Sequence, residues 1–344
     1  MLRRAASLMS RLPRPLLVTI LAAGVVLAVL PARHPPATAL QPAGHAPATA
    51  LQPARHALAT AFQPAGPRAP AAAWPGRHGC GGGADLTVEV RSGGRRRVAL
   101  VHVPRGVRRG APLMMALHGA HADGPFMARY SGLSRVADRA GFVVAYPSSL
   151  GRPAFWDLTG PGDVAFGRRL VDRLWRTGCV DTRRTYAVGV SNGGGMTARL
   201  GCELSSRLAG IVVVAGGFRS LPACAPDRPV SVLEIHGTDD QVVPYAGRAD
   251  DGFAGDVRAW VDGWVRRDGC LPQPRERLLA PRAEQLAWGP CAQGSAVEHI
   301  VLQGGQHAWP GATPPDPGPR ASISAAAQAW RFLRSRRLAH APAG

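Results

Sequence analysis

A serine ringed by glycines is the first part of the sequence that could do chemistry. In TYAVGVSNGGGMT (185–197), Gly189 and Gly193 flank Ser191 in a G-x-S-x-G pattern directly after an apolar run. This pattern is typical of a sharp strand-to-helix turn that lifts a nucleophilic hydroxyl out of a sheet, and larger residues at the flanking positions would collide. We expect Ser191 to be a nucleophile and the backbone N–H of Asn192 to face the oxyanion that forms during attack.

A serine nucleophile of this kind needs an acid and then a histidine further along the chain. HGTDDQVVPY (236–245) carries Asp239 and Asp240 after one apolar run, and GGQHAWPG (304–311) carries His307 after another. We expect Asp240 to be the acid of a catalytic triad and His307 its general base, while Asp239 serves the turn through its own backbone. The competing histidines are His118, His121, His236 and His299, of which His299 lies inside an expected strand and should pack in the core.

The second oxyanion donor must come from the loop after the third strand. ALHGAHADG (116–124) supplies it, and we assign the backbone N–H of Ala120, with Gly119 allowing close approach and His118 orienting the loop. The sequence contains no H-E-x-x-H motif and no paired cysteine-histidine spacing. We therefore expect neither a metal ion nor a cofactor.

These loops need a scaffold, and short apolar runs bounded by turn residues predict one. The expected strands lie near 86–90, 97–103, 113–117, 142–146, 185–190, 211–215, 230–235 and 296–302, and the expected helices near 126–140, 163–177, 193–207, 253–268 and 321–337. Gly93 and Gly94 predict a hairpin between the first two strands. The alternation predicts an α/β fold: a mostly parallel eight-stranded sheet with helices on both faces and reactive loops at the carboxyl ends of the strands.

Seven segments, taken in order, resemble the secreted polyhydroxybutyrate depolymerase and feruloyl esterase family of α/β-hydrolases over residues 79 to about 338. They are GGRRRVALVHVPRG, ALHG, ADRAGFVVAYP, DVAFGRRLVD, VSNGGGMTARLGCEL, HGTDDQVVPY and GGQHAWPG. The resemblance implies the α/β-hydrolase fold and the same triad of Ser191, Asp240 and His307. Two positions depart from the family pattern outside the triad: Gly195 replaces the usual methionine, and Ala120-His121 replaces small polar residues.

The amino-terminal region reads as an export signal and a linker. Four arginines precede an apolar run at 16–30, followed by the small residues Ala37-Thr38-Ala39. Fifteen helical residues span about 22 Å against about 30 Å of hydrocarbon, so a cleaved signal is favoured and an uncleaved membrane anchor is the alternative. We expect a signal peptide at 1–39, a disordered Ala/Pro-rich repeat linker at 40–78, a catalytic domain at 79–338 and a tail at 339–344, in a secreted, extracellular protein.

The charge of the chain is unevenly distributed. All 41 basic residues are arginine and the formal net charge is +19, but residues 80–319 hold 28 arginines against 22 acids. No basic stripe with stacking aromatics and no nucleic-acid-binding module is visible, so we expect no nucleic-acid partner.

Six cysteines allow fifteen pairings, and export permits disulfides. Their places relative to the expected elements favour two short bridges and one long one. The expected pairs are Cys202–Cys224, Cys270–Cys291 and Cys80–Cys179.

These observations predict a monomeric serine esterase that hydrolyses carboxylic esters, with Trp156, Tyr245 and Trp309 lining the substrate site or, equally, packing in the core. We expect feruloyl- or acetyl-type polysaccharide esters or short hydroxyalkanoate oligomers as substrates. The chain has no long insertion for a lid and continues for only 37 residues after His307, which disfavours the alternative of a depolymerase acting on solid polyhydroxybutyrate. A non-catalytic secreted binding protein is the alternative of another class.

Overall fold

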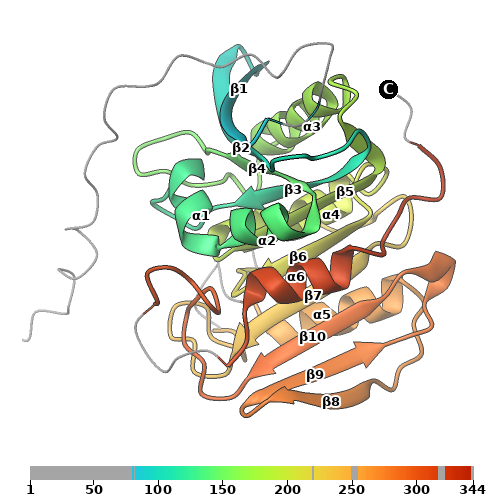
Figure 1. Ribbon diagram of the computed structural model, residues 1–344. Helices are drawn as coiled ribbons and strands as arrows, with labels where there is room; N and C mark the ends of the chain where they lie inside the picture. Colours follow the sequence, from blue (N-terminus) through green and yellow to red (C-terminus); the bar gives the residue numbers. More distant parts are fainter. Residues whose placement is uncertain (1–79, 81, 219–220, 249–254, 317–321, 342–344) are drawn as a thin grey trace, which may run out of the picture. The chain divides into compact units, whose positions relative to one another are not determined.

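The computed structural model describes residues 80, 82–218, 221–248, 255–316 and 322–341, which form a sheet covered by helices on both faces (Figure 1). The expected signal peptide and linker lie outside the described residues. The ten strands are β1 (Ala84–Ser92), β2 (Arg95–Val103), β3 (Ala111–Leu117), β4 (Val143–Pro147), β5 (Val180–Val190), β6 (Gly210–Val214), β7 (Ser231–Gly237), β8 (Arg275–Ala280), β9 (Ala283–Trp288) and β10 (Val297–Leu302).

The strands form a single sheet in the order β1-β2-β4-β3-β5-β6-β7-β10-β9-β8. The six central strands from β4 to β10 run parallel, whereas β2 pairs antiparallel with β4, and β9 pairs antiparallel with β10. The central strands are almost continuous apolar runs, which suits a sheet buried on both faces. Because these strands are parallel, the loops after β3, β5, β7 and β10 all leave the sheet on the same side, at the carboxyl ends of the strands.

Two helical layers bury the faces of the sheet. The helices are α1 (Gly124–Ser131), α2 (Leu133–Ala140), α3 (Gly162–Trp175), α4 (Asn192–Glu203), α5 (Val257–Arg267) and α6 (Ala325–Leu333), with a short 3-10 turn η1 (Ala292–Gly294). Residues of α3, α4 and α5 share one buried cluster, and residues of α1, α2 and α6 share the other. Figure 1 shows α2 and α6 in front of the sheet.

The observed elements differ from the expected ones in two places. The sheet has ten strands rather than eight, because β8 and β9 are not among the predicted strands. Their sequences, RERLLA and AEQLAW, have no β-branched residue and carry charges, and β8 is a largely exposed edge strand. The helix expected over 126–140 is divided at Gly132, whose φ of +71° ends α1 and begins α2.

Three disulfides tie the described chain together. They join Cys80 to Cys179, Cys202 to Cys224, and Cys270 to Cys291, the same pairs as expected from the sequence. The first links the entry of the domain to the residue before β5, and the second links α4 to the segment after β6.

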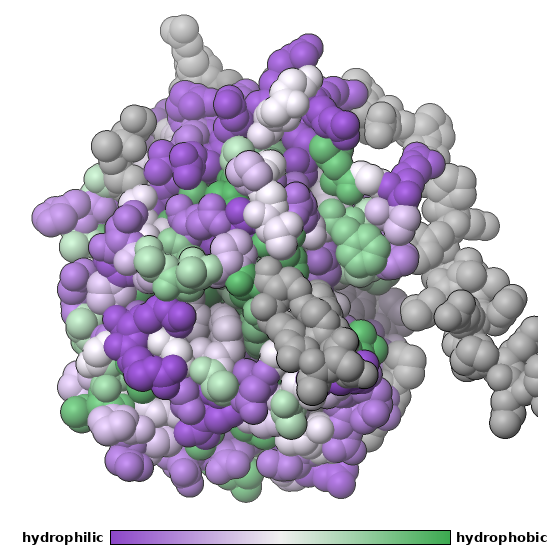
Figure 2. All heavy atoms as spheres, turned by 180° about the vertical axis from the view of Figure 1, so that it is seen from behind, coloured by the Kyte–Doolittle hydropathy of each residue, from purple (hydrophilic) through white to green (hydrophobic). Residues whose placement is uncertain are grey.

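Viewed from behind, hydrophilic side chains cover most of the described surface and apolar ones form small separate areas (Figure 2). Within the described residues, no helix is both long and apolar enough to cross a bilayer. A cavity of about 200 Å³ lies beside α4 and α5, lined by residues that include Arg199, Trp260 and the Cys202–Cys224 disulfide. Its lining contains none of the residues predicted for the triad, so we regard it as a gap between helices.

Candidate active site

Ser191 occupies a strained turn between β5 and α4. Its φ of 57° and ψ of −123° are unusual for a residue with a side chain, and β5 ends one residue before it while α4 begins one residue after it. A Cβ added to Gly189 would lie 2.2 Å from the Gly193 carbonyl oxygen, and one added to Gly193 would lie 2.3 Å from the His118 carbonyl oxygen. Both flanking glycines are therefore sterically required, and the turn presses closely against the loop after β3.

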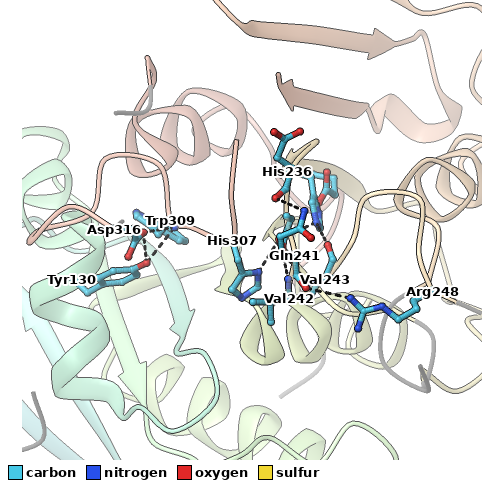
Figure 3. A network of polar contacts seen from close by, with 12 residues as sticks. Tyr130, His236, Gln241, Val242, Val243, Arg248, His307, Trp309 and Asp316 are labelled. Carbon is cyan, nitrogen blue, oxygen red and sulfur yellow. Dashed lines mark hydrogen bonds and ion pairs between the residues drawn. The ribbon is translucent and has the colours of Figure 1, made fainter. Parts of the chain in front are cut away.

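The loops after β7 and β10 bring a carboxylate and a histidine together. His307 Nδ1 lies 2.7 Å from Asp240 Oδ2, with the His307 side chain 20% exposed and the Asp240 side chain fully buried. The other carboxylate oxygen accepts the backbone N–H groups of Val242 and Val243, at 2.9 and 2.8 Å. Figure 3 shows the His307 ring directed toward the loop that carries Val242 and Val243. The pair has the geometry of a base oriented by a buried acid.

Asp240 is held in its ionised form. Burial of the carboxyl opposes ionisation, but hydrogen bonds from His236 and His307 outweigh burial and hold the pKa of Asp240 well below its usual range. The neighbouring Asp239 is exposed, and its carboxylate accepts a local hydrogen bond of 3.3 Å from Thr238. The structure thus places Asp240, and not Asp239, against His307.

Backbone contacts lock the acid loop to the histidine loop. The Asp239 N–H donates to the Gly305 carbonyl at 2.9 Å, and the Gly304 N–H donates to Thr238 Oγ1 at 2.8 Å. A Cβ at Gly237 would lie 2.1 Å from the Gly305 carbonyl oxygen. These contacts fix the separation of the two loops independently of the Asp240–His307 hydrogen bond.

The loop after β3 lies against the serine turn, as the expected oxyanion loop should. A Cβ added to Gly119 would lie 3.5 Å from Ser191 Cβ. His118 is buried, which lowers its pKa, and its Nε2 accepts the Ser149 N–H at 3.1 Å while Nδ1 lies 2.7 Å from the Gly119 carbonyl. His118 therefore orients the loop as a neutral imidazole. The backbone N–H groups of Ala120 and Asn192 remain the predicted oxyanion donors.

The three aromatic residues expected near the substrate form hydrogen bonds within the protein. Trp309 is 1% exposed and its indole N–H donates to the Ser131 carbonyl at 2.9 Å. Trp156 is 3% exposed and its indole N–H donates to the His118 carbonyl at 2.9 Å. The Tyr245 hydroxyl lies 2.8 Å from His299 Nε2. Trp156 and Trp309 are buried, which agrees with the alternative that they pack in the core, whereas Tyr245 is half-buried. A role of these side chains in substrate binding stays a prediction.

Backbone hydrogen bonds of Trp156 and Trp309 connect segments around the candidate site. The Asn192 side chain bonds both the N–H and the carbonyl of Trp156, at 2.7 and 3.2 Å, which joins the start of α4 to the segment before α3. The Trp309 N–H and the Tyr130 hydroxyl both donate to Asp316 Oδ2, at 2.8 and 2.6 Å (Figure 3). The segment after His307 is thereby anchored to α1. No pattern in the sequence points to this anchor, since Tyr130 and Asp316 are 186 residues apart.

Two further histidines and a glutamate lie buried behind Asp240. Glu234 and His236 on β7 and His299 on β10 have fully buried side chains, and both histidines contact Glu234. The sequence predicts His299 in the core, but it does not predict the network that His299 forms. The only signal is the presence of Glu234 and His236 within the apolar run VLEIHG. Among the described residues, no group of three or more such side chains has the arrangement to hold a metal ion.

Comparison with known proteins adds a family to this geometry. No protein-family model matches the chain. Feruloyl esterase C from Emericella nidulans is 32% identical over 203 residues, covering 56% of this chain and 70% of the relative. The bifunctional acetylxylan esterase/xylanase XynS20E from Neocallimastix patriciarum is 29% identical over 217 residues, covering 63% of this chain but only 32% of that longer protein.

The fold agrees with a solved esterase. The acetyl xylan esterase from Aspergillus awamori superimposes with a TM-score of 0.58 at 15% identity, covering 73% of this chain and 99% of that one. At this identity the likeness shows the fold alone, which is the α/β-hydrolase fold expected from the sequence. At 32% identity over 70% of the relative's length, feruloyl esterase C shows that the chain belongs to the esterase family of α/β-hydrolases, and that it is a carboxylic ester hydrolase.

Proposed function

We propose that this protein is a secreted serine esterase that removes feruloyl or acetyl groups from polysaccharides, with Ser191, Asp240 and His307 as its catalytic triad. The observation that carries the triad is the 2.7 Å contact between His307 Nδ1 and the buried Asp240. It occurs at the carboxyl ends of the parallel strands, where the strained Ser191 turn also lies. The names of the relatives support the choice of ester, and the three disulfides support export to an oxidising compartment.

In this mechanism His307 removes the proton from Ser191 as the serine oxygen attacks the ester carbonyl carbon. Asp240 accepts the hydrogen bond from the Nδ1 proton, which leaves Nε2 free to act as the base and stabilises the imidazolium that forms. The N–H groups of Ala120 and Asn192 hold the oxyanion while His307 returns the proton to the leaving alcohol. Water then attacks the acyl-enzyme, again with His307 as base, and releases the acid.

Removing the nucleophile tests the triad directly. We expect Ser191→Ala to lower kcat by a thousandfold or more while circular dichroism and melting temperature stay near wild type, because only the reacting oxygen is lost. The matched control is Ser322→Ala, at an exposed serine before α6. Wild-type-like turnover by purified Ser191→Ala would remove the proposed mechanism.

A substrate panel tests the choice of ester. Methyl ferulate, acetylated xylan, a hydroxybutyrate trimer and solid polyhydroxybutyrate should be compared at equal enzyme concentration. We expect the largest kcat/KM on the first two and little clearing of the solid polymer. Rapid clearing of the solid, with no release of ferulate or acetate, would contradict this choice without affecting the triad.

A further inference from the structure

A buried charge network lies behind the proposed triad, and the mechanism above does not use it. Glu234 and His236 are on β7, His299 is on the neighbouring strand β10, and Asp240 lies three residues beyond the end of β7. Glu234 and His299 are 0% exposed, and His236 and Asp240 are 1% exposed. Four ionisable side chains with so little access to solvent must compensate one another's charges.

The hydrogen-bond partners of His236 determine its protonation. Its Nδ1 lies 2.9 Å from Glu234 Oε1, and its Nε2 lies 2.9 Å from the Val243 carbonyl oxygen and 3.3 Å from Asp240 Oδ2. All three partners are acceptors. A neutral imidazole has one protonated nitrogen, so it would direct a lone pair at one of these oxygens, whereas an imidazolium donates on both sides.

The partners of His299 require no such charge. Its Nδ1 faces Glu234, at 2.7 Å from Oε2 and 3.4 Å from the backbone carbonyl oxygen, and its Nε2 lies 2.8 Å from the Tyr245 hydroxyl. Burial raises the pKa of Tyr245 to about 12, so this hydroxyl keeps its proton and can donate it to Nε2. A His299 ring with one proton, on Nδ1, can therefore donate toward Glu234 and accept from Tyr245.

We infer that His236 is a permanently charged positioning residue, a buried imidazolium that pairs with Glu234 and holds Asp240 ionised and oriented toward His307. This inference rests on the proposed triad. Asp240 Oδ2 lies between the two histidines, 2.7 Å from His307 Nδ1 and 3.3 Å from His236 Nε2. Burial disfavours the charged form of His236, but Glu234 and Asp240 outweigh burial and raise the pKa of His236 to about 10.

The groups around His236 determine how its charge should affect catalysis. Its ring faces Glu234 on its own strand, Asp240 and Val243 on the following loop, and Tyr245, with His299 reaching it through Glu234. The charges of Asp256, Arg258 and Asp262, at the start of α5 and within it, influence the ionisation of the Tyr245 hydroxyl. A positive charge at His236 opposes a second positive charge on His307. Removing it should make His307 easier to protonate and shift the loss of activity to higher pH.

The first measurement detects the imidazolium without using activity. Imidazole nitrogen chemical shifts in ¹⁵N-histidine-labelled full-length protein should be followed from pH 5 to pH 9, with His236 assigned by its absence in His236→Gln. We expect both His236 nitrogens to stay protonated throughout the range. A neutral His236 at pH 7 would overturn the inference, and because no turnover is involved, this outcome is independent of whether Ser191 is the nucleophile.

The second measurement detects the effect on the base. For His236→Gln we expect the acid limb of the kcat/KM profile on p-nitrophenyl acetate to move up by about one pH unit. The matched control is His102→Gln, because His102 also lies between two carboxylates, Asp85 at 2.8 Å and Asp138 at 2.9 Å, on the remote strand β2. An unchanged acid limb in a folded His236→Gln protein, or an equal shift in the control, would contradict the inference.

If His236→Gln does not fold, Glu234→Gln keeps the test decisive. The glutamine amide can donate to Nδ1, which lets His236 give up its second proton. We expect one pH-independent imidazolium signal of the wild type to be replaced by a neutral-ring signal. Persistence of the imidazolium in Glu234→Gln would show that Glu234 is not its counter-ion.

Discussion

At the scale of single residues, the adjacent aspartates Asp239 and Asp240 have different surroundings and different proposed roles. Asp240 is buried, accepts two backbone N–H groups and contacts His307, whereas Asp239 is exposed and its N–H donates to Gly305. The two side chains are identical in type and adjacent in sequence. Their burial and their hydrogen-bond partners differ, so a pair of matched substitutions can separate the two roles.

We expect Asp240→Asn to lower kcat by about a hundredfold to ten-thousandfold, because an amide can hold His307 in the wrong tautomer and cannot stabilise its charge. Asp239→Asn keeps the exposed loop geometry and should remain near wild type. Steady-state kinetics on p-nitrophenyl acetate, with melting temperatures as the folding control, measure both. The opposite ranking would refute the assignment of the acid.

At the scale of elements, the turn between β5 and α4 depends on close packing against the end of β3. A Cβ at Gly193 would lie 2.3 Å from the His118 carbonyl oxygen and 2.5 Å from the Leu117 carbonyl oxygen, so a side chain there must displace backbone. By contrast, a Cβ at Gly162, the first residue of α3, meets nothing within 4 Å.

We expect Gly193→Ala to cost about 1 to 3 kcal/mol of unfolding free energy and to lower kcat/KM strongly, because it pushes the predicted oxyanion loop away from Ser191. Gly162→Ala should be neutral or slightly stabilising, since alanine favours a helix over glycine. Urea denaturation and kinetics on both variants test this difference. Equal effects would show that the close backbone approach at Gly193 is not limiting.

The end of α5 contains a buried carboxyl whose ionisation costs stability. Asp268 directly follows α5, is 0% exposed, and accepts the Val230 N–H at 3.2 Å. Burial raises the pKa of Asp268 to about 6. Because this is above its usual value of about 3.9 in the unfolded chain, the folded state binds the proton more tightly. The cost is therefore absent below about pH 4 and fully present above about pH 6.

We expect Asp268→Asn to raise the unfolding free energy at pH 8 by about 2 to 3 kcal/mol, because the amide keeps the acceptor for Val230 without the buried charge. The gain should shrink as the pH falls from 6 to 4. Urea denaturation at pH 4, 6 and 8 measures it. A gain that is the same at all three values would exclude ionisation of Asp268 as its cause.

At the scale of the whole molecule, the three disulfides close loops of very different length. Cys80 and Cys179 are 99 residues apart, whereas the other pairs are 22 and 21 residues apart. The long bridge holds the entry of the domain, next to the β1–β2 edge of the sheet, to the start of the central strand β5. A bridge that closes a longer loop removes more conformational entropy from the unfolded chain.

We expect the double variant Cys80→Ala/Cys179→Ala to lose about 5 kcal/mol of unfolding free energy, against about 3 kcal/mol for each of the two other double variants. Equilibrium urea denaturation of the three variants under non-reducing conditions gives the ranking. Non-reducing peptide mapping of the wild type should recover the three predicted pairs. A smaller loss for the long bridge would contradict the chain-entropy argument.

The fold of this protein could be predicted from local patterns in its sequence, and the catalytic triad stays a prediction from the same kind of pattern. The alternation of apolar runs with amphipathic stretches predicted the α/β fold, which is confirmed. The glycine spacing around Ser191 and the order of serine, acid and histidine predicted the triad. These signals are local, because each depends on residues within one turn, strand or helix. The strands β8 and β9 were missed for the same reason: they pair only with each other and with β10, and their charged sequences lack strand propensity.

The surroundings of the predicted site depend on the tertiary structure. Tyr245 and Trp309 closely follow Asp240 and His307 in sequence and Trp156 does not, yet the polar atoms of all three make long-range hydrogen bonds, to His118 from Trp156, to His299 from Tyr245 and to Ser131 from Trp309. The network of Glu234, His236 and His299 likewise depends on the parallel register of β7 and β10, which places His299 beside Glu234 across 65 residues of chain. Burial and long-range hydrogen bonding are properties of packed neighbours, so no pattern within a single segment could have revealed them.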